Sequence, residues 1–167
     1  MKWKIEGPFD TNERHGWVPQ VFGNVVVFRV GRGLFAWDLT KNEKIWSKEL
    51  PEDEAYGNKQ STKCGGYYVT FSDIASRHEP GPVFAIDPQT GETVWRTLVE
   101  AHCGGFEKGL TASHQSIFFH GYYEPDKQYN FIKLDPQTGE IIWKQPGQFA
   151  KQVVWRDDHL FLEVGLD

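Results

Sequence analysis

The chain has 167 residues, which is enough to bury a substantial core as one domain, residues 1–167. Its 39% hydrophobic and 15% aromatic content is too apolar for a disordered chain. Its net charge of −5 argues against nucleic acid or an anionic membrane surface as the main partner, because phosphate binding requires a basic face. The sequence has no secretory signal pattern and no stretch long enough to span a membrane, so we expect a cytoplasmic protein.

The chain begins with a segment that resembles one isolated strand. Trp3 precedes Trp46 by 43 residues, close to the interval that separates the later tryptophans. We therefore expect residues 1–16 to form a lone outer strand followed by a linker.

Three copies of one unit follow, at residues 17–50, 60–99 and 109–146. In each copy an apolar hairpin precedes a second hairpin that ends in tryptophan, so each copy holds four short strands, as a β-propeller blade does. Trp46, Trp95 and Trp143 follow one another at intervals of 49 and 48 residues, and an aspartate precedes each by eight residues. The repeat predicts an all-β fold: a partial (half) β-propeller of three complete four-stranded antiparallel blades plus an incomplete one.

The turn before each tryptophan supports this alignment. Asp87 is placed to accept hydrogen bonds from backbone N–H groups of the turn, and Gly91 suits the left-handed position that closes it. In the first copy Asn42 stands where the others have glycine, and asparagine tolerates a positive φ better than other non-glycine residues. The tryptophan that follows each turn is expected to pack flat against the neighbouring sheet.

The second copy carries a specific pattern, Ala85-x-Asp87-x-x-Thr90-Gly91-x-x-x-Trp95. This pattern resembles the tryptophan-docking repeat of the PQQ-like (quinoprotein-type) β-propellers. The third copy has Lys133 in place of the alanine, and the first copy departs further from the pattern. The resemblance covers roughly residues 17–165 and implies the propeller fold.

Residues 150–165 match only the first hairpin of a blade, so the number of blades is below that of an ordinary closed propeller. Two arrangements fit: a strained four-bladed ring closed by the two chain ends, or an open arc, which we favour because the large aromatic residues suit a wider ring. An open arc leaves strands that a partner, a second copy or loops must cover. A homodimer that completes a propeller is one such solution.

The sequence predicts no catalytic, cofactor-binding or metal-ligating residue. The resemblance implies no quinone site, because quinoprotein dehydrogenases use adjacent cysteines and more blades, whereas Cys64 and Cys103 lie 39 residues apart. His102, together with His114 or His120, lacks the spacing of metal ligands. We therefore expect no enzymatic activity, no cofactor and no metal.

The longer connections, at residues 47–59, 72–81, 96–109 and 122–129, are expected on one face of the propeller, and function on a scaffold concentrates in such loops. Tyrosines flanked by carboxylates are typical of a patch that binds a basic protein, although the same composition suits solvated loops whose tyrosines pack locally. The predicted partner-binding residues are Glu49, Glu52, Asp53, Glu54, Tyr56, Arg77, His78, Glu79, Phe106, Tyr122, Tyr123 and Asp126.

These features favour a non-enzymatic protein-binding module. In size, charge and lack of catalytic apparatus the chain is similar to the immunity proteins that bacteria pair with toxins, and the cognate toxin would be basic and nuclease-like. The alternative is a scaffold or assembly factor of the envelope lipoprotein type that the same repeat builds, which would require export.

Overall fold

The computed structural model describes residues 19–30, 32–50, 60–71, 78–102, 110–113, 115–148, 152–156 and 159–163. Every regular element in these ranges is a β-strand. The same ranges hold no helix that is long and apolar enough to cross a membrane.

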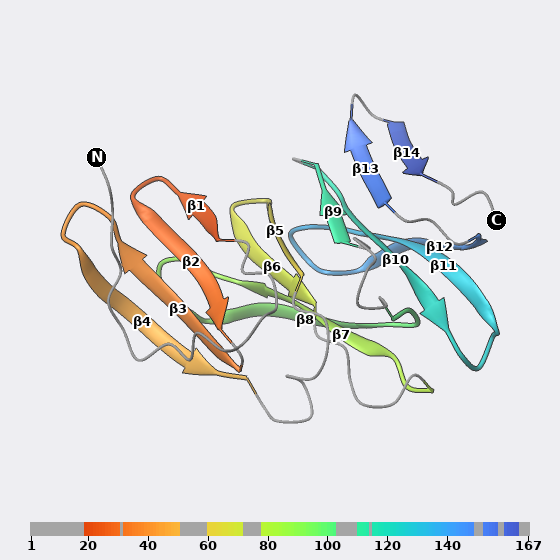
Figure 1. The fold of residues 1–167 in the computed structure, drawn as a ribbon, viewed down its shortest axis with the longest axis horizontal. Coiled ribbons are helices and arrows are strands. Elements are labelled where there is room, and N and C mark those ends of the chain that lie inside the picture. Colours follow the sequence, from red (N-terminus) through yellow and green to blue (C-terminus); the bar gives the residue numbers. More distant parts are fainter. Residues whose placement is uncertain are drawn as a thin grey trace.

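The strands form three four-stranded sheets and one two-stranded sheet (Figure 1). Blade 1 contains β1 (Gln20–Phe22), β2 (Val25–Val30), β3 (Gly33–Asp38) and β4 (Glu43–Glu49). Blade 2 contains β5 (Ser61–Cys64), β6 (Tyr67–Phe71), β7 (Gly81–Ile86) and β8 (Thr93–Val99). Blade 3 contains β9 (Leu110–Ala112), β10 (Ile117–Tyr123), β11 (Gln128–Leu134) and β12 (Ile141–Gly147), and the half-blade contains β13 (Gln152–Arg156) and β14 (His159–Glu163).

All pairs of neighbouring strands are antiparallel, and each four-stranded sheet keeps its strands in chain order. The first strands of successive blades contact one another, β1 with β5, β5 with β9, and β9 with β13. Figure 1 shows blade 1 at one end of the molecule and blade 3 with the half-blade at the other. The predicted partial propeller of three blades and an incomplete one is confirmed.

Each complete blade carries a β-bulge at the same place. In blade 2, Ala85 pairs with Trp95 and Ile86 pairs with Thr93, so Val94 has no partner on β7. The unpaired residues Ile45, Val94 and Ile142 are all exposed, at 40%, 43% and 51%. A bulge adds one residue and changes the direction of the side chains that follow. The exposed apolar residue before each tryptophan is therefore the consequence of turning that tryptophan toward the next blade.

The tryptophans of blades 1 and 2 dock on the turn of the following blade. The Trp46 indole N–H donates to the carbonyl of Pro88 (3.0 Å), and the Trp95 indole N–H donates to the carbonyl of Pro136 (3.0 Å). Each ring lies against the turn glycine, because a Cβ added to Gly91 or Gly139 would stand only 2.6 or 2.5 Å from it. The expected packing of the tryptophan on the neighbouring sheet is confirmed for both. We call residues 38–42, 87–91 and 135–139 the docking turns.

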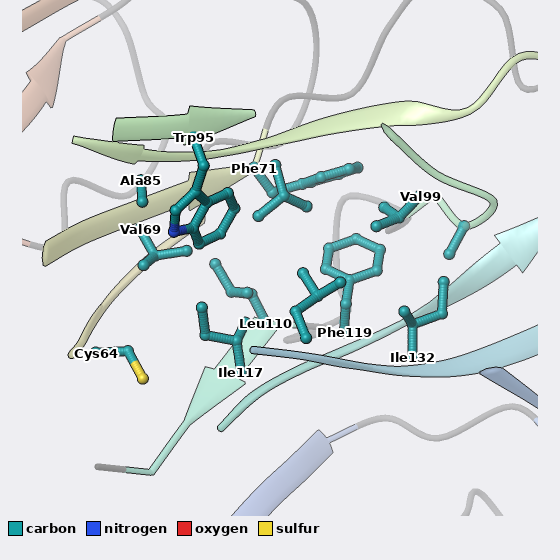
Figure 2. Close-up of a cluster of buried hydrophobic side chains, with 13 residues drawn as sticks. Cys64, Val69, Phe71, Ala85, Trp95, Val99, Leu110, Ile117, Phe119 and Ile132 are labelled. Carbon is teal, nitrogen blue, oxygen red and sulfur yellow. The ribbon is translucent and has the colours of Figure 1, made fainter. Parts of the chain in front are cut away.

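The two cores lie between the blades. Blade 2 presents Val69, Phe71 and Val83 to Ile117 and Phe119 of blade 3 in the cluster that Figure 2 shows. Its opposite face presents Tyr68, Phe84 and Ile86 to blade 1. Both faces of the middle blade are thus buried. All six residues of β7 are accordingly buried, and the four that follow its glycine and proline are apolar.

Candidate functional site

The antiparallel strand order divides the connections between two faces. The tight turns that join first to second and third to fourth strands lie at one edge of each sheet, which we call the turn face. The connections between second and third strands, and those that lead to the next blade, lie at the opposite edge, the loop face. The longer connections of the chain join strand ends at this edge, while residues 51–59, 72–77 and 103–109 themselves lie outside the described ranges.

On the loop face, blade 2 and blade 3 meet through a short backbone bridge. His102 and Tyr122 exchange two backbone hydrogen bonds of 2.8 and 2.9 Å. Gly121 makes this approach possible, because a Cβ there would stand 2.5 Å from the carbonyl oxygen of His102. The buried Asn130 adds a hydrogen bond from its amide to the carbonyl of Glu100 (2.7 Å). The segment that leaves blade 2 is therefore fixed against β10 and β11.

Tyr123 lies at the centre of this contact. Its side chain is 8% exposed, its ring stacks against that of His102, and its hydroxyl donates to the carbonyl of His78 (3.4 Å). Burial raises the pKa of Tyr123, and the carboxylates of Glu100, Asp126 and Glu79 raise it further. The charges of three carboxylates thus act on one tyrosine, and the ammonium of Lys144 opposes them.

Lys144 is the cation of the group. Its ammonium pairs with Glu100, lies 3.2 Å from a carboxylate oxygen of Asp126, and stands over the Tyr123 ring. Burial alone would lower the pKa of Lys144, but the two carboxylates outweigh this effect and raise it. One ammonium against three carboxylates leaves the cluster net negative. We call Glu79, Glu100, Tyr122, Tyr123 and Asp126 the acidic junction.

The structure brings five of the predicted partner-binding residues together in or beside the acidic junction: His78, Glu79, Tyr122, Tyr123 and Asp126. His78, Glu79 and Asp126 are exposed, Tyr122 is half-buried and Tyr123 is buried. Glu49 is exposed at the end of β4, in blade 1. Glu52, Asp53, Glu54, Tyr56, Arg77 and Phe106 lie outside the described residues, so these predictions stay open.

All four predicted loops are shorter than the sequence indicated, since β4 includes the start of 47–59 and β7 begins at Gly81. Residues 122–129 were expected to form a loop, but Tyr122 pairs with Tyr129 and the connection is only the turn Glu124 to Lys127. The two tyrosine rings pack edge to face across the strands, and Lys127 takes a positive φ of 50° in the turn. Aromatic pairing across the strands therefore extends the hairpin. Likewise, β8 continues to Val99, so the first part of residues 96–109 is strand.

A family model described as "Outer membrane protein assembly factor BamB", of the PQQ-like repeat type, matches residues 79–165. The chain belongs to this family. The predicted resemblance to PQQ-like repeat propellers is thereby confirmed. No curated protein matches the chain.

Solved structures with a similar fold include a europium-containing methanol dehydrogenase, with 16% identity over 79% of this chain and a TM-score of 0.56. The N-terminal domain of Nup159 has 11% identity over 89% and a TM-score of 0.54, and Kluyveromyces lactis Hsv2 has 14% identity over 84% and a TM-score of 0.50. The matches cover 24%, 40% and 38% of those chains, so this PQQ-like repeat chain spans a quarter to two fifths of their length. At these identities the likeness shows the fold alone.

The other reactive side chains that the structure describes in this PQQ-like repeat protein, Cys64 and His120, are buried in the packed sheets. Cys64 is buried, its thiol donates to the carbonyl of Ser113 (2.9 Å), and burial raises its pKa to about 11. His120 is buried against Tyr129 and Phe131, and burial lowers its pKa. Within the described ranges no three His, Cys, Asp or Glu side chains are grouped so that they could hold a metal ion. Cys103 and His114 lie outside these ranges.

The sequence did not indicate that Glu100, His102 and Lys144 lie in or beside the acidic junction. Glu100 and Lys144 are 44 residues apart, and no motif links them. Their meeting depends on the close approach at Gly121, for which an isolated glycine in a strand is the only sequence signal.

Proposed function

We propose that the chain is a non-enzymatic protein-binding module whose contact surface is the acidic junction. The supporting observation is the grouping of Glu79, Glu100 and Asp126 around Tyr123, with Lys144 as the cation opposite them. Carboxylates on the rim of an interface favour a basic partner and accelerate its encounter. The half-buried Tyr122 adds an aromatic ring that is already held by Tyr129, so its contact with a partner costs little conformational entropy.

The more specific proposal is a small cytoplasmic immunity or inhibitor protein that neutralises a basic, nuclease-like toxin. The net charge of −5 supports it, because an inhibitor of a nuclease competes with nucleic acid for a basic surface. The second candidate is an assembly scaffold. The observation behind it is the description of the matching family, which names an outer membrane protein assembly factor.

Charge reversal tests the surface. The variant Glu79→Lys with Asp126→Lys changes two exposed residues of the acidic junction, and the matched control Glu92→Lys with Glu140→Lys makes the same change on the turn face. Tagged protein would capture partners from the source cells, and the amount of each captured protein would be compared by quantitative mass spectrometry. We expect the junction variant to retain a tenth or less of a basic partner that the wild type and the control both capture.

The control also separates binding from folding. Lys144 retains Glu100 in the junction variant, and a lost exposed ion pair costs about 0–1 kcal/mol, so both double variants should unfold near the wild-type urea midpoint. Equal capture by the junction variant and the control would refute the proposed surface.

A second assay separates the two candidates. The captured basic protein would be tested for nuclease activity with and without an equimolar amount of the chain. Inhibition that the junction variant fails to produce supports the immunity protein. A partner without nuclease activity, or one that stays active in the complex, favours the scaffold instead.

A further inference from the structure

Lys144 of β12 brings a positive charge into the acidic junction. Its side chain lies on the face of blade 3 that turns toward blade 2, because its register partner on β11 is Ile132, a member of the core between these blades. Its ammonium pairs with Glu100, which follows β8 of blade 2, and lies 3.2 Å from a carboxylate oxygen of Asp126 in blade 3. The same ammonium stands 5.8 Å from the centroid of the Tyr123 ring. Blades 2 and 3 thus build a site for a cation, and a lysine of the chain itself occupies it.

The ion pairs of Lys144 are open to solvent. The side chains of Lys144, Glu100 and Asp126 are 30%, 46% and 37% exposed. Exposed ion pairs contribute little to stability, because water screens both charges and the pairing restricts both side chains. Another cation can therefore replace the Lys144 ammonium without disturbing the core between blades 2 and 3.

The repeat does not require a lysine at this position. The residue that follows the tryptophan of each repeat unit is Ser47 in blade 1, Arg96 in blade 2 and Lys144 in blade 3. Arg96 is exposed, and its guanidinium lies over the ring of Phe84, its register partner on β7. The position therefore accepts a small polar residue as well as a long cation. The placement of Lys144 between two carboxylates is accordingly a property of the acidic junction and not of the blade.

The chemistry of the group that replaces Lys144 follows from what Lys144 already supplies. A lysine of a partner would exchange one ammonium for another and would gain no new hydrogen bond with the carboxylates. An arginine differs, because its planar guanidinium presents its N–H donors in a fixed fork and binds a carboxylate bidentately. A guanidinium can therefore hold Glu100 or Asp126 more strongly than the ammonium of Lys144 does.

We propose that Lys144 is a built-in competitor of the acidic junction, which an arginine of the partner displaces from Glu100 and Asp126. This inference rests on the proposed function of the junction as a contact surface for a basic protein. While the ammonium of Lys144 lies there, it neutralises part of the acidic charge, and a lysine of the partner gains nothing by replacing it. A partner arginine releases this ammonium to water and takes over its carboxylates.

Peptides of known charge test the competitor without knowledge of the partner. Labelled hexa-arginine and hexa-lysine would be titrated with the full chain, and binding would be followed by fluorescence anisotropy at low ionic strength, where exposed charges are least screened. Lys144→Met keeps an unbranched side chain without the charge. The matched control Lys41→Met removes the same charge from an exposed residue of the turn face. Because the two variants have the same net charge, a difference between them reports the site rather than the overall charge.

We expect Lys144→Met to bind hexa-arginine about threefold more tightly than Lys41→Met does, a factor that the release of exposed ion pairs accounts for. Lys144→Arg should bind hexa-arginine less tightly than the wild type, because a guanidinium on the chain competes better than an ammonium. Every form of the chain should bind hexa-arginine more tightly than hexa-lysine. Equal or weaker binding of hexa-arginine by Lys144→Met, tighter binding by Lys144→Arg, or no preference for hexa-arginine overturns the inference.

The junction variant Glu79→Lys with Asp126→Lys separates this inference from the proposed function. If that variant loses both the captured partner and hexa-arginine while Lys144→Met gains no affinity, Lys144 is not a competitor and the proposed surface stands. If the variant binds hexa-arginine as tightly as the control Glu92→Lys with Glu140→Lys, the surface is wrong and the inference falls with it. Absence of saturable hexa-arginine binding by Lys144→Met overturns the inference alone, because the capture experiment decides the surface independently.

Discussion

Substitution of the docked tryptophan of blade 2 should destabilise the fold strongly. Trp95 is 8% exposed, packs against Gly139 and donates its indole N–H to the carbonyl of Pro136. Trp95→Ala removes the ring from the core between blades 2 and 3 and leaves that carbonyl without its donor. Trp143→Ala removes the same side chain from the same position of blade 3, where no described turn covers it.

The two substitutions should differ severalfold in cost. Truncation of a buried tryptophan to alanine destabilises a protein by about 3–5 kcal/mol, because the lost transfer free energy adds to a cavity that closes only in part. The unpaired carbonyl accounts for about 1 kcal/mol of the loss at Trp95. At Trp143 the ring is half-exposed and makes no described hydrogen bond, so we expect a loss of about 1 kcal/mol, in the range of ordinary point mutants.

Urea unfolding followed by far-ultraviolet circular dichroism measures both losses, because the backbone signal does not depend on which tryptophan is removed. Wild type, Trp95→Ala and Trp143→Ala would be compared through their midpoints and slopes. Trp95→Phe serves as a further control, since it keeps most of the ring and should recover more than half of the loss. A loss below about 1 kcal/mol at Trp95, or equal losses at both positions, would refute the docking role given to Trp95.

Three further predictions concern turns and titrating groups. Gly66→Ala and Gly139→Ala both place a Cβ at a positive φ, which costs about 1–2 kcal/mol. The added Cβ would have nothing within 4 Å at Gly66, but at Gly139 it would stand 2.5 Å from the docked Trp95 ring. Gly139→Ala should therefore lower the urea midpoint further than Gly66→Ala, and equal shifts would contradict the packing of Trp95 on Gly139. Burial raises the pKa of Cys64 to about 11. In the variant Cys103→Ser, the Cys64 thiol of the folded protein should therefore resist a disulfide-exchange reagent at pH 8 and react only when urea unfolds the chain. Fast labelling of the folded protein would show that Cys64 is accessible. Hydrogen bonds from its own turn lower the pKa of Asp38 to about 2, below the unfolded value near 4, so the stability that the Asp38 carboxylate contributes is complete above pH 4 and is lost as the pH falls through 2. In Asp38→Asn the free energy of unfolding should therefore fall less steeply with pH in that window. A slope equal to that of the wild type would count against these hydrogen bonds in the turn.

The repeat could be predicted from the sequence because its spacing is imposed by the fold. An aspartate eight residues before a tryptophan fixes a turn and a docked ring together, so the three blades and the docking of Trp46 and Trp95 followed from the pattern. The bulges that expose Ile45, Val94 and Ile142 could not be predicted in this way. No glycine or proline marks them, because the requirement comes from the direction of the next side chain rather than from local backbone preference.

Asn42 has the backbone conformation that its turn requires, but it carries a Cβ where the other two docking turns have glycine. Its positive φ of 56° agrees with the turn that the sequence predicted. At the equivalent position of blade 2, a Cβ added to Gly91 would stand 2.6 Å from the docked Trp46 ring, and no local turn rule indicates this limit. The acidic junction was likewise only half predictable. Asp126 and Glu79 stood out as charges near tyrosines, whereas the partnership of Glu100 with Lys144 depends on how blade 2 leads into blade 3.

The central claim is that the three blades are joined in chain order by tryptophans that dock on the turn of the following blade. Indole N–H hydrogen exchange, measured by NMR on the assigned protein, tests it most directly. We predict slow exchange for Trp46 and Trp95, whose indole N–H groups donate to the carbonyls of Pro88 and Pro136, and faster exchange for Trp143, whose indole makes no hydrogen bond to the described residues. Fast exchange at Trp95, or protection of Trp143 in the chain alone as strong as that of Trp95, would contradict the account.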